Sequence, residues 1–116
     1  MTRTFIEVPL FTKRWLDLEL TDIELSELEW MIVKNPSIGP IMQGTGGLRK
    51  VRFAVDNRGK SHSIRVCYVD FEEFELTYLI TVYKKNEQEN LTGEQKNTIR
   101  KLIAALKEEV RSNYKR

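Results

Sequence analysis

Residues 44–69, GTGGLRKVRFAVDNRGKSHSIRVCYV, contain the pattern that decides the fold. In residues 48–55 apolar side chains alternate with polar or charged ones, and a similar alternation returns in residues 64–69. A period of two is typical of a β-strand with one buried face. Residues 56–60, DNRGK, separate the two runs and favour a turn. The stretch therefore predicts a β-hairpin.

Further elements are predicted on either side of this hairpin. In chain order they are a short strand at residues 4–8, a brief helix at 11–18, a helix at 21–34, a third strand at 74–83 and a long helix that begins after Thr92. Thr21 and Glu24 have the spacing of a capping box, as have Thr92 and Gln95. In the third strand, alternation predicts one core face made of Phe74, Leu76, Tyr78, Ile80 and Val82.

Strands this close in sequence most simply pair as an antiparallel meander. The predicted fold class is therefore α+β, a small antiparallel β-sheet with helices packed on one face. Hydrophobic residues make up 41% of the chain and charged residues 31%, which is typical of a single globular domain over residues 1–116. Trp15 and Trp30 are expected to pack the helices, with partner binding as the alternative.

The composition also limits the chemistry. A single cysteine, Cys67, excludes an internal disulfide, and with only one histidine a His/Cys metal centre is not expected. We therefore predict no cofactor and no metal, and expect Cys67 to be a small, partly buried strand residue rather than a nucleophile. No apolar run approaches the roughly 20 residues of a membrane helix, and no secretory signal is visible. A cytoplasmic location without a membrane partner is expected.

Positive charge is concentrated on the hairpin. The net charge of the whole chain is only +2. Residues 1–48 hold four Lys/Arg and seven Asp/Glu, a net charge of −3, whereas residues 49–70 hold six and two, a net charge of +4. The six basic residues are Arg49, Lys50, Arg52, Arg58, Lys60 and Arg65. Such a local field suits a polyanion, and nucleic acid is the commonest one.

Strand parity selects which of these side chains act together. The face opposite Val51 and Phe53 collects Lys50, Arg52, Arg65, Thr81 and Tyr83, and Lys85 follows in the same parity. Several cations beside an aromatic hydroxyl could clamp a phosphodiester and stabilise charge on it. The alternative is an ordinary solvated sheet face, because antiparallel sheets commonly have one polar side.

Four segments resemble the HigB-like branch of the RelE toxin superfamily: GTGGLRKVR at residues 44–52, RGKS at 58–61, IRVCY at 64–68 and YKKNE at 83–87. The similarity extends from the helix at 21–34 to the helix opened by Leu91-Thr92. Members of this family are toxins of bacterial type II toxin–antitoxin pairs. They cut mRNA in the ribosomal A site without a metal, by attack of the ribose 2′-OH on the adjacent phosphate.

The resemblance implies roles for individual residues. Lys50, Arg52 and Arg65 would contact the scissile phosphate, and Lys85 would stabilise charge in the transition state. Tyr83 would stack on a base or orient a hydroxyl, and Arg49 would contact the nucleic-acid backbone. The other implied substrate-binding residues are Arg58, Lys60, His62 and Lys84. The implied partners are a helix-turn-helix antitoxin, the ribosomal A site and mRNA.

Two departures from the family pattern leave alternatives open. Ser61-His62-Ser63 replaces the family's glycines, so that His62 is either a general acid or base or an exposed loop residue without a role. Leu91 lies where some relatives have a tyrosine base. The alternative function is therefore a catalytically inactive module that only binds antitoxin or RNA. A purely structural domain would leave the charge segregation unexplained.

Overall fold

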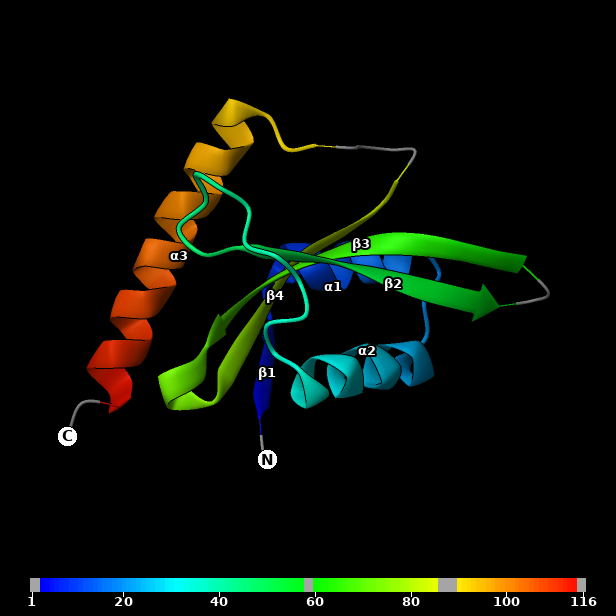
Figure 1. Ribbon diagram of the computed structural model, residues 1–116, viewed down its shortest axis with the longest axis horizontal. Coiled ribbons are helices and arrows are strands. Elements are labelled where there is room, and N and C mark those ends of the chain that lie inside the picture. The colour runs from blue at the N-terminus through cyan, green and yellow to red at the C-terminus, as the bar shows by residue number, and fades with distance from the viewer. Residues whose placement is uncertain (1–2, 58–59, 86–89, 115–116) are drawn as a thin grey trace.

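The protein is a four-stranded sheet with helices on both faces (Figure 1). The computed structural model describes residues 3–57, 60–85 and 90–114. For residues 56, 57, 60–62 and 114 it describes the backbone alone. In chain order the elements are β1 (Thr4–Glu7), α1 (Pro9–Asp17), α2 (Asp22–Lys34), β2 (Arg49–Asn57), β3 (Lys60–Phe71), the 3₁₀ turn η1 (Glu72–Phe74), β4 (Leu76–Lys84) and α3 (Gly93–Tyr114). Within these residues, no helix combines the length and the apolar character needed to cross a membrane.

The predicted α+β class is confirmed, and the sheet is mixed. Its strand order is β1-β4-β3-β2, in which β2, β3 and β4 form the expected antiparallel meander. The N-terminal strand β1 pairs with β4 in parallel, so the sheet is not purely antiparallel. The chain can make this parallel connection because α1, α2 and the meander separate the two strands.

Helices cover both faces, which corrects the expectation of one covered face. On the first face, α1 and α2 pack against β2, β3 and β4 through a core that includes Phe11, Trp15, Leu28, Ile32, Phe53, Val66 and Val82. On the second face, α3 packs through Ile103 and Val110 against Cys67, Val69 and Tyr78. Residues 66–69 of β3 are apolar on both faces of the sheet. A search for alternation assigns only one of these faces to a core, so the second core was not predicted.

A β-bulge in β4 divides the predicted apolar set. Tyr68 pairs with Leu79 and Cys67 pairs with Thr81, so that Ile80 is an extra residue on β4. Leu76, Tyr78 and Ile80 pack on the α3 face, whereas Val82 packs on the α1–α2 face. The prediction that these residues share one face is therefore wrong, because the bulge reverses the parity of the strand.

The predicted helix starts are confirmed. The Thr21 hydroxyl accepts from the Glu24 N–H at 3.2 Å, and the Glu24 carboxylate accepts from the Thr21 N–H at 2.8 Å. Thr92 and Gln95 form the matching pair before α3, at 3.1 and 2.9 Å. Each box satisfies two backbone donors that a helix start would leave without partners.

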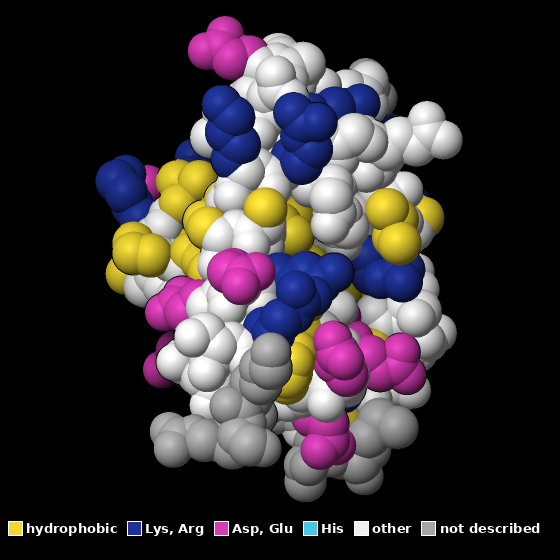
Figure 2. All heavy atoms as spheres, turned by 90° about the vertical axis from the view of Figure 1, so that its left-hand side faces the viewer, with side chains coloured by type: hydrophobic (Ala, Val, Ile, Leu, Met, Phe, Trp, Pro, Cys, Tyr) yellow, Lys and Arg dark blue, Asp and Glu magenta, His cyan; other side chains and the backbone are white. Residues whose placement is uncertain are grey.

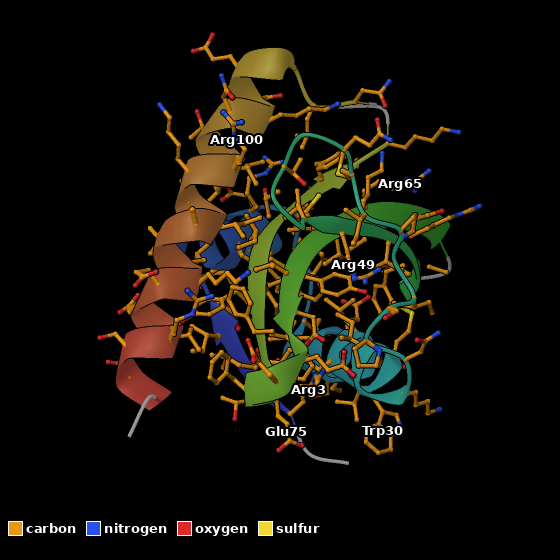
Figure 3. The ribbon with its side chains drawn as sticks, turned by 60° about the vertical axis from the view of Figure 1, so that its left-hand side comes forward. Arg3, Trp30, Arg49, Arg65, Glu75 and Arg100 are labelled. Atoms are coloured by element: carbon orange, nitrogen blue, oxygen red, sulfur yellow. The ribbon has the colours of Figure 1, made fainter. Side chains whose placement is uncertain are left out.

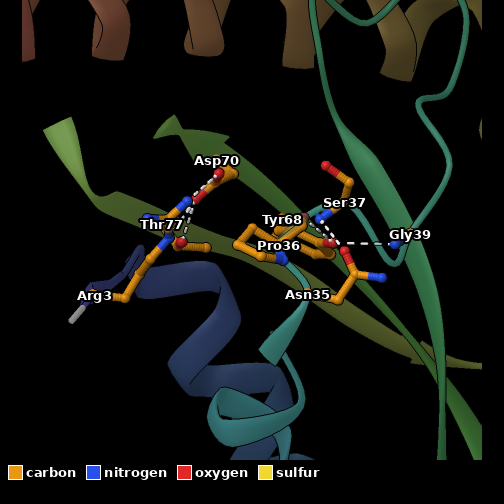
Figure 4. A network of polar contacts seen from close by, with 8 residues as sticks. All are labelled: Arg3, Asn35, Pro36, Ser37, Gly39, Tyr68, Asp70 and Thr77. Atoms are coloured by element: carbon orange, nitrogen blue, oxygen red, sulfur yellow. Dashed lines mark hydrogen bonds and ion pairs between the residues drawn. The ribbon is translucent and has the colours of Figure 1, made fainter. Parts of the chain in front are cut away.

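A buried ion pair fixes β1 to the middle of the sheet. The Arg3 guanidinium donates twice to the Asp70 carboxylate, at 2.9 and 2.6 Å, and the Thr77 hydroxyl donates to the same carboxylate at 2.7 Å (Figure 4). The side chains of Arg3 and Asp70 are only 3% and 7% exposed. Bidentate geometry and an additional donor are what a buried pair needs to offset desolvation.

Asp70→Asn should therefore destabilise the fold by about 3–5 kcal/mol, because it leaves the buried Arg3 charge without its counter-ion. Asp17→Asn is the matched control, since Asp17 pairs with Lys13 at 2.8 Å but is 48% exposed. The control should change the free energy of unfolding by less than about 1 kcal/mol. Denaturant unfolding measures both, and equal effects would contradict this account.

Candidate nucleic-acid interface

The strand register places the basic residues of the hairpin in two neighbouring rows. Lys50 pairs with Cys67, which pairs with Thr81, and Arg52 pairs with Arg65, which pairs with Tyr83. Directly opposite residues in a sheet share a face, with Cβ atoms about 4.5–5.5 Å apart. The parity prediction is confirmed in this respect, because Lys50, Arg52, Arg65, Thr81 and Tyr83 lie together on the α3 side of the sheet.

In the row that contains Arg52 and Arg65, a buried hydrogen-bond donor has no acceptor among the described residues. Arg52 donates from Nε to the Ser63 hydroxyl at 3.0 Å, which ties the Arg52 side chain to β3. The Nη1 atom of Arg65 is buried and has no hydrogen-bond partner among the described residues. A buried charged donor without a partner is costly, and two like charges directly opposite each other add repulsion. An anion between the two guanidinium groups would relieve both costs.

Tyr83 lies beside Arg65 and is almost fully buried, with 4% of its surface exposed. Its hydroxyl has no hydrogen-bond partner in the described part of the chain, although the nearby Cys67 thiol influences its pKa. Burial, with a smaller contribution from Cys67, raises the pKa of Tyr83 to about 12. Its ring and its hydroxyl oxygen are both buried, so Tyr83 exposes neither group in this conformation, and its implied role of stacking on a base or orienting a hydroxyl stays a prediction.

Cys67 is buried at the centre of the site face, as expected for a strand residue. Burial raises the pKa of its thiol to about 12, although the Lys50 ammonium and Tyr83 act in the opposite direction. At neutral pH both Cys67 and Tyr83 are therefore protonated and neutral. Neither is suited to act as a general base, whose pKa should lie near the working pH.

Tyr68 holds the loop that precedes β2, through Pro36 and Gly39 (Figure 4). The Tyr68 hydroxyl donates to the Pro36 carbonyl at 2.8 Å and accepts from the Gly39 N–H at 3.1 Å. The Lys50 N–H donates to the Pro40 carbonyl at 3.2 Å. A Cβ atom at Gly39 would lie 2.9 Å from the Lys50 carbonyl oxygen, so only glycine allows this close approach of the two segments.

Arg49 belongs to this loop rather than to the two rows. Its Nη1 donates to the Gly39 carbonyl at 2.8 Å, and it pairs with Tyr68 on the other face of the sheet. Figure 3 shows Arg49 and Arg65 at separate positions on the hairpin. The structure gives Arg49 a role in fixing the loop, and its implied contact with a nucleic-acid backbone stays a prediction.

The remaining implied residues are scattered. Lys85 is exposed in the turn after β4, and Lys84 pairs with Ile64, which places Lys84 on the face opposite the two rows. Arg58 lies outside the described residues, as do the side chains of Lys60 and His62. His62 lies in β3, where its backbone pairs with that of Val55 in β2. His62 is therefore a strand residue and not a loop residue.

Two basic residues of α3 were missed by the sequence reading. The chain at Gly44 and Gly46 runs close to α3, where added Cβ atoms would lie 3.9 Å from the Lys96 side chain and 3.3 Å from that of Arg100. In Figure 3, Arg100 lies on the part of α3 that approaches this loop. The sequence offered only their spacing of four residues, which places them on one side of a helix without saying what that side contacts.

Figure 2 views the molecule from the α3 side. Lys and Arg side chains stand out in the upper half of this face, and Asp and Glu lie mostly in the lower half. A cleft of about 740 Å³ opens between β4, α1 and the start of α3, with Thr81, Tyr83 and Gln95 in its lining. Among the described residues, no three His, Cys, Asp or Glu side chains are grouped as a metal site.

The architecture is similar to that of a solved structure of E. coli toxin RelE, a double arginine-to-alanine mutant in the free state. The similarity has a TM-score of 0.53 and covers 77% of this chain and 90% of that chain. The chain has a RelE-like fold. Sequence identity over the match is 18%, and no protein-family model matches the sequence. The two proteins therefore share the fold at low sequence identity.

The buried thiol offers a direct test of the site's packing. At pH 8 a pKa of about 12 leaves about one thiolate in ten thousand, so native Cys67 should react with iodoacetamide far more slowly than in denaturant. Mass spectrometry of the alkylated protein measures both rates, with Cys67→Ser as the blank. A native rate within tenfold of the unfolded rate would show that the Cys67 thiol is not buried.

Proposed function

We propose that the protein is the toxin of a type II toxin–antitoxin pair and a ribosome-dependent mRNA endonuclease of the HigB-like branch. The observation that carries this proposal is the Arg52–Arg65 pair, with its buried and unpartnered Nη1 atom, on a sheet face next to Lys50 in a RelE-like fold. A phosphodiester supplies the anion that this arrangement lacks.

In the proposed reaction the 2′-oxygen of one ribose attacks the adjacent phosphorus. The 2′-hydroxyl loses its proton, the bond from phosphorus to the 5′-oxygen breaks, and that oxygen takes up a proton. The products are a 2′,3′-cyclic phosphate and a 5′-hydroxyl. The steps assigned to this chain need no metal, because its cations neutralise the charge that develops on the phosphate oxygens.

Individual residues have distinct roles in this proposal. Arg65 and Arg52 hold the phosphate with their guanidinium groups, and Lys50 supplies a third cation from the neighbouring row. Lys85, exposed after β4, reaches the developing charge from solvent. Tyr83 orients a hydroxyl as a neutral donor, because the pKa of about 12 keeps it protonated. One of the basic groups or His62 would transfer the proton.

The partners follow from this assignment. The basic rows would face mRNA in the ribosomal A site, and a helix-turn-helix antitoxin would hold the toxin inactive in the cytoplasm. The alternative is a RelE-fold module that binds antitoxin or RNA without cutting. The high pKa values of Tyr83 and Cys67 are compatible with this alternative, because neither of these two residues can act as a base at neutral pH.

Induced expression in a bacterial host, followed by mapping of mRNA 5′ ends, tests the proposal. The wild-type protein should arrest growth and give cuts in phase with codons. Lys50→Ala/Arg65→Ala should reduce cutting by about 10²–10³-fold or more, because two groups that stabilise the transition state are removed. Lys101→Ala/Lys107→Ala, on the exposed surface of α3, is the charge-matched control and should cut like wild type.

Each outcome decides between the two functions. Loss of cutting in a folded Lys50→Ala/Arg65→Ala variant, with the control unaffected, supports the nuclease. Cutting that survives in that variant would contradict the assigned site. Wild-type protein that is soluble but neither arrests growth nor cuts mRNA would favour the binding module.

A further inference from the structure

An apolar groove lies between β1 and α2, away from the basic rows. Its volume is about 570 Å³, with Phe5 from β1 and Ile23, Trp30 and Val33 from α2 in its lining. Ile23 is 75% exposed and Trp30 is 60% exposed. The expectation that Trp30 packs between helices is therefore wrong. Large apolar side chains gathered in one exposed groove mark an interaction site, and tryptophan is typical of the residues that dominate binding energy.

The groove runs along a strand whose second edge is unpaired in the described chain. The sheet order places β1 at one end, where it pairs with β4 and with no other described strand. Phe5 packs against the core on the α1–α2 face, so the groove and the basic rows lie on opposite faces of the sheet. An open strand edge can accept an extended segment of another chain through main-chain hydrogen bonds.

Charge decides what kind of segment fits. Glu27 and Glu29 line the groove, and Glu7 is close enough to Glu29 to raise its pKa, in addition to the larger effect of burial. Of the two nearby cations, Arg3 is engaged by Asp70, and Lys34 lies over the Trp30 ring at 5.9 Å from its centre. The groove therefore carries an excess of acid.

This excess argues against the other possible occupants. A nucleic acid would be repelled by the carboxylates. A symmetric dimer through the groove would bring the acidic walls of two copies together, and like charges facing each other across an interface cost free energy.

We propose that this groove binds an extended, basic segment of a protein partner. The segment adds a strand beside β1, packs an apolar side chain against Ile23 and Trp30, and directs separate Lys or Arg side chains at Glu27 and at Glu29. Because the groove and the basic rows lie on opposite faces, this partner binds at the same time as RNA. The inference does not depend on the proposed nuclease activity.

Selection of random dodecapeptides displayed on phage tests the proposal. Peptides are selected on wild-type protein and depleted on Trp30→Ala, whose exposed position leaves the fold intact. The enriched sequences should contain Lys or Arg next to apolar residues. Synthetic copies should bind wild type by calorimetry and lose at least tenfold in affinity for Glu27→Gln/Glu29→Gln.

Three controls make the result specific to the groove. Glu108→Gln/Glu109→Gln removes the same charge from the exposed surface of α3 and should leave peptide affinity unchanged. N-methylation of alternate peptide nitrogens should abolish binding, because it removes the main-chain donors that an added strand uses. Excess single-stranded RNA should not displace the peptide.

Several outcomes would overturn the proposal. One is the absence of peptides that depend on Trp30, and another is enrichment of acidic peptides. Equal affinity for wild type and Glu27→Gln/Glu29→Gln would remove the charge argument. A dimer in sedimentation that Trp30→Ala dissociates would assign the groove to a second copy of the chain.

Discussion

The arrangement of the site depends on the bulge at Ile80 in β4. Without this extra residue, Val82 would pair with Arg65, and Thr81 would face the core of α1 and α2 beside Val66. The bulge instead places Thr81 and Tyr83 on the face that carries Lys50, Arg52 and Arg65, and returns Val82 to the core. One inserted residue thus lets β4 pack into both cores and still place Thr81 and Tyr83 beside the basic residues. Bulges are commonly found beside functional sites.

The face of the sheet that packs against α3 has a buried part and a polar part, because α3 covers only some of it. Where Ile103 and Val110 pack, the face is core, and near Arg52 the face is polar. Rigidity at that end comes from the Tyr68 hydroxyl, which holds the loop before β2 at two backbone points. The Arg52 side chain is tied to β3 by the Ser63 hydroxyl, and a cation held in place before the phosphate binds needs little reorganisation, which is the physical basis of electrostatic catalysis.

Much of this arrangement could be predicted from sequence, and the failures have physical causes. The hairpin, the capping boxes and the shared face of Lys50, Arg52 and Arg65 follow from local periodicity, which side-chain geometry enforces. The second core could not be predicted, since Cys67 and Val69 read as the outer face of a half-buried strand. The position of the bulge at Ile80 and the exposure of Trp30 depend on tertiary contacts that no local pattern encodes. His62 was misplaced because β3 begins as early as Lys60.

The central claim is that the open end of the sheet is a preformed phosphate site. Nuclear magnetic resonance of the arginine Nε–Hε groups tests it most directly, during titration with a single-stranded RNA hexamer whose 2′-oxygens are methylated and cannot attack. We expect the signals of Arg52 and Arg65 to shift together and saturably, while that of Arg111, exposed near the far end of α3, stays in place. Shifts confined to other arginines, or no shifts at all, would contradict the claim.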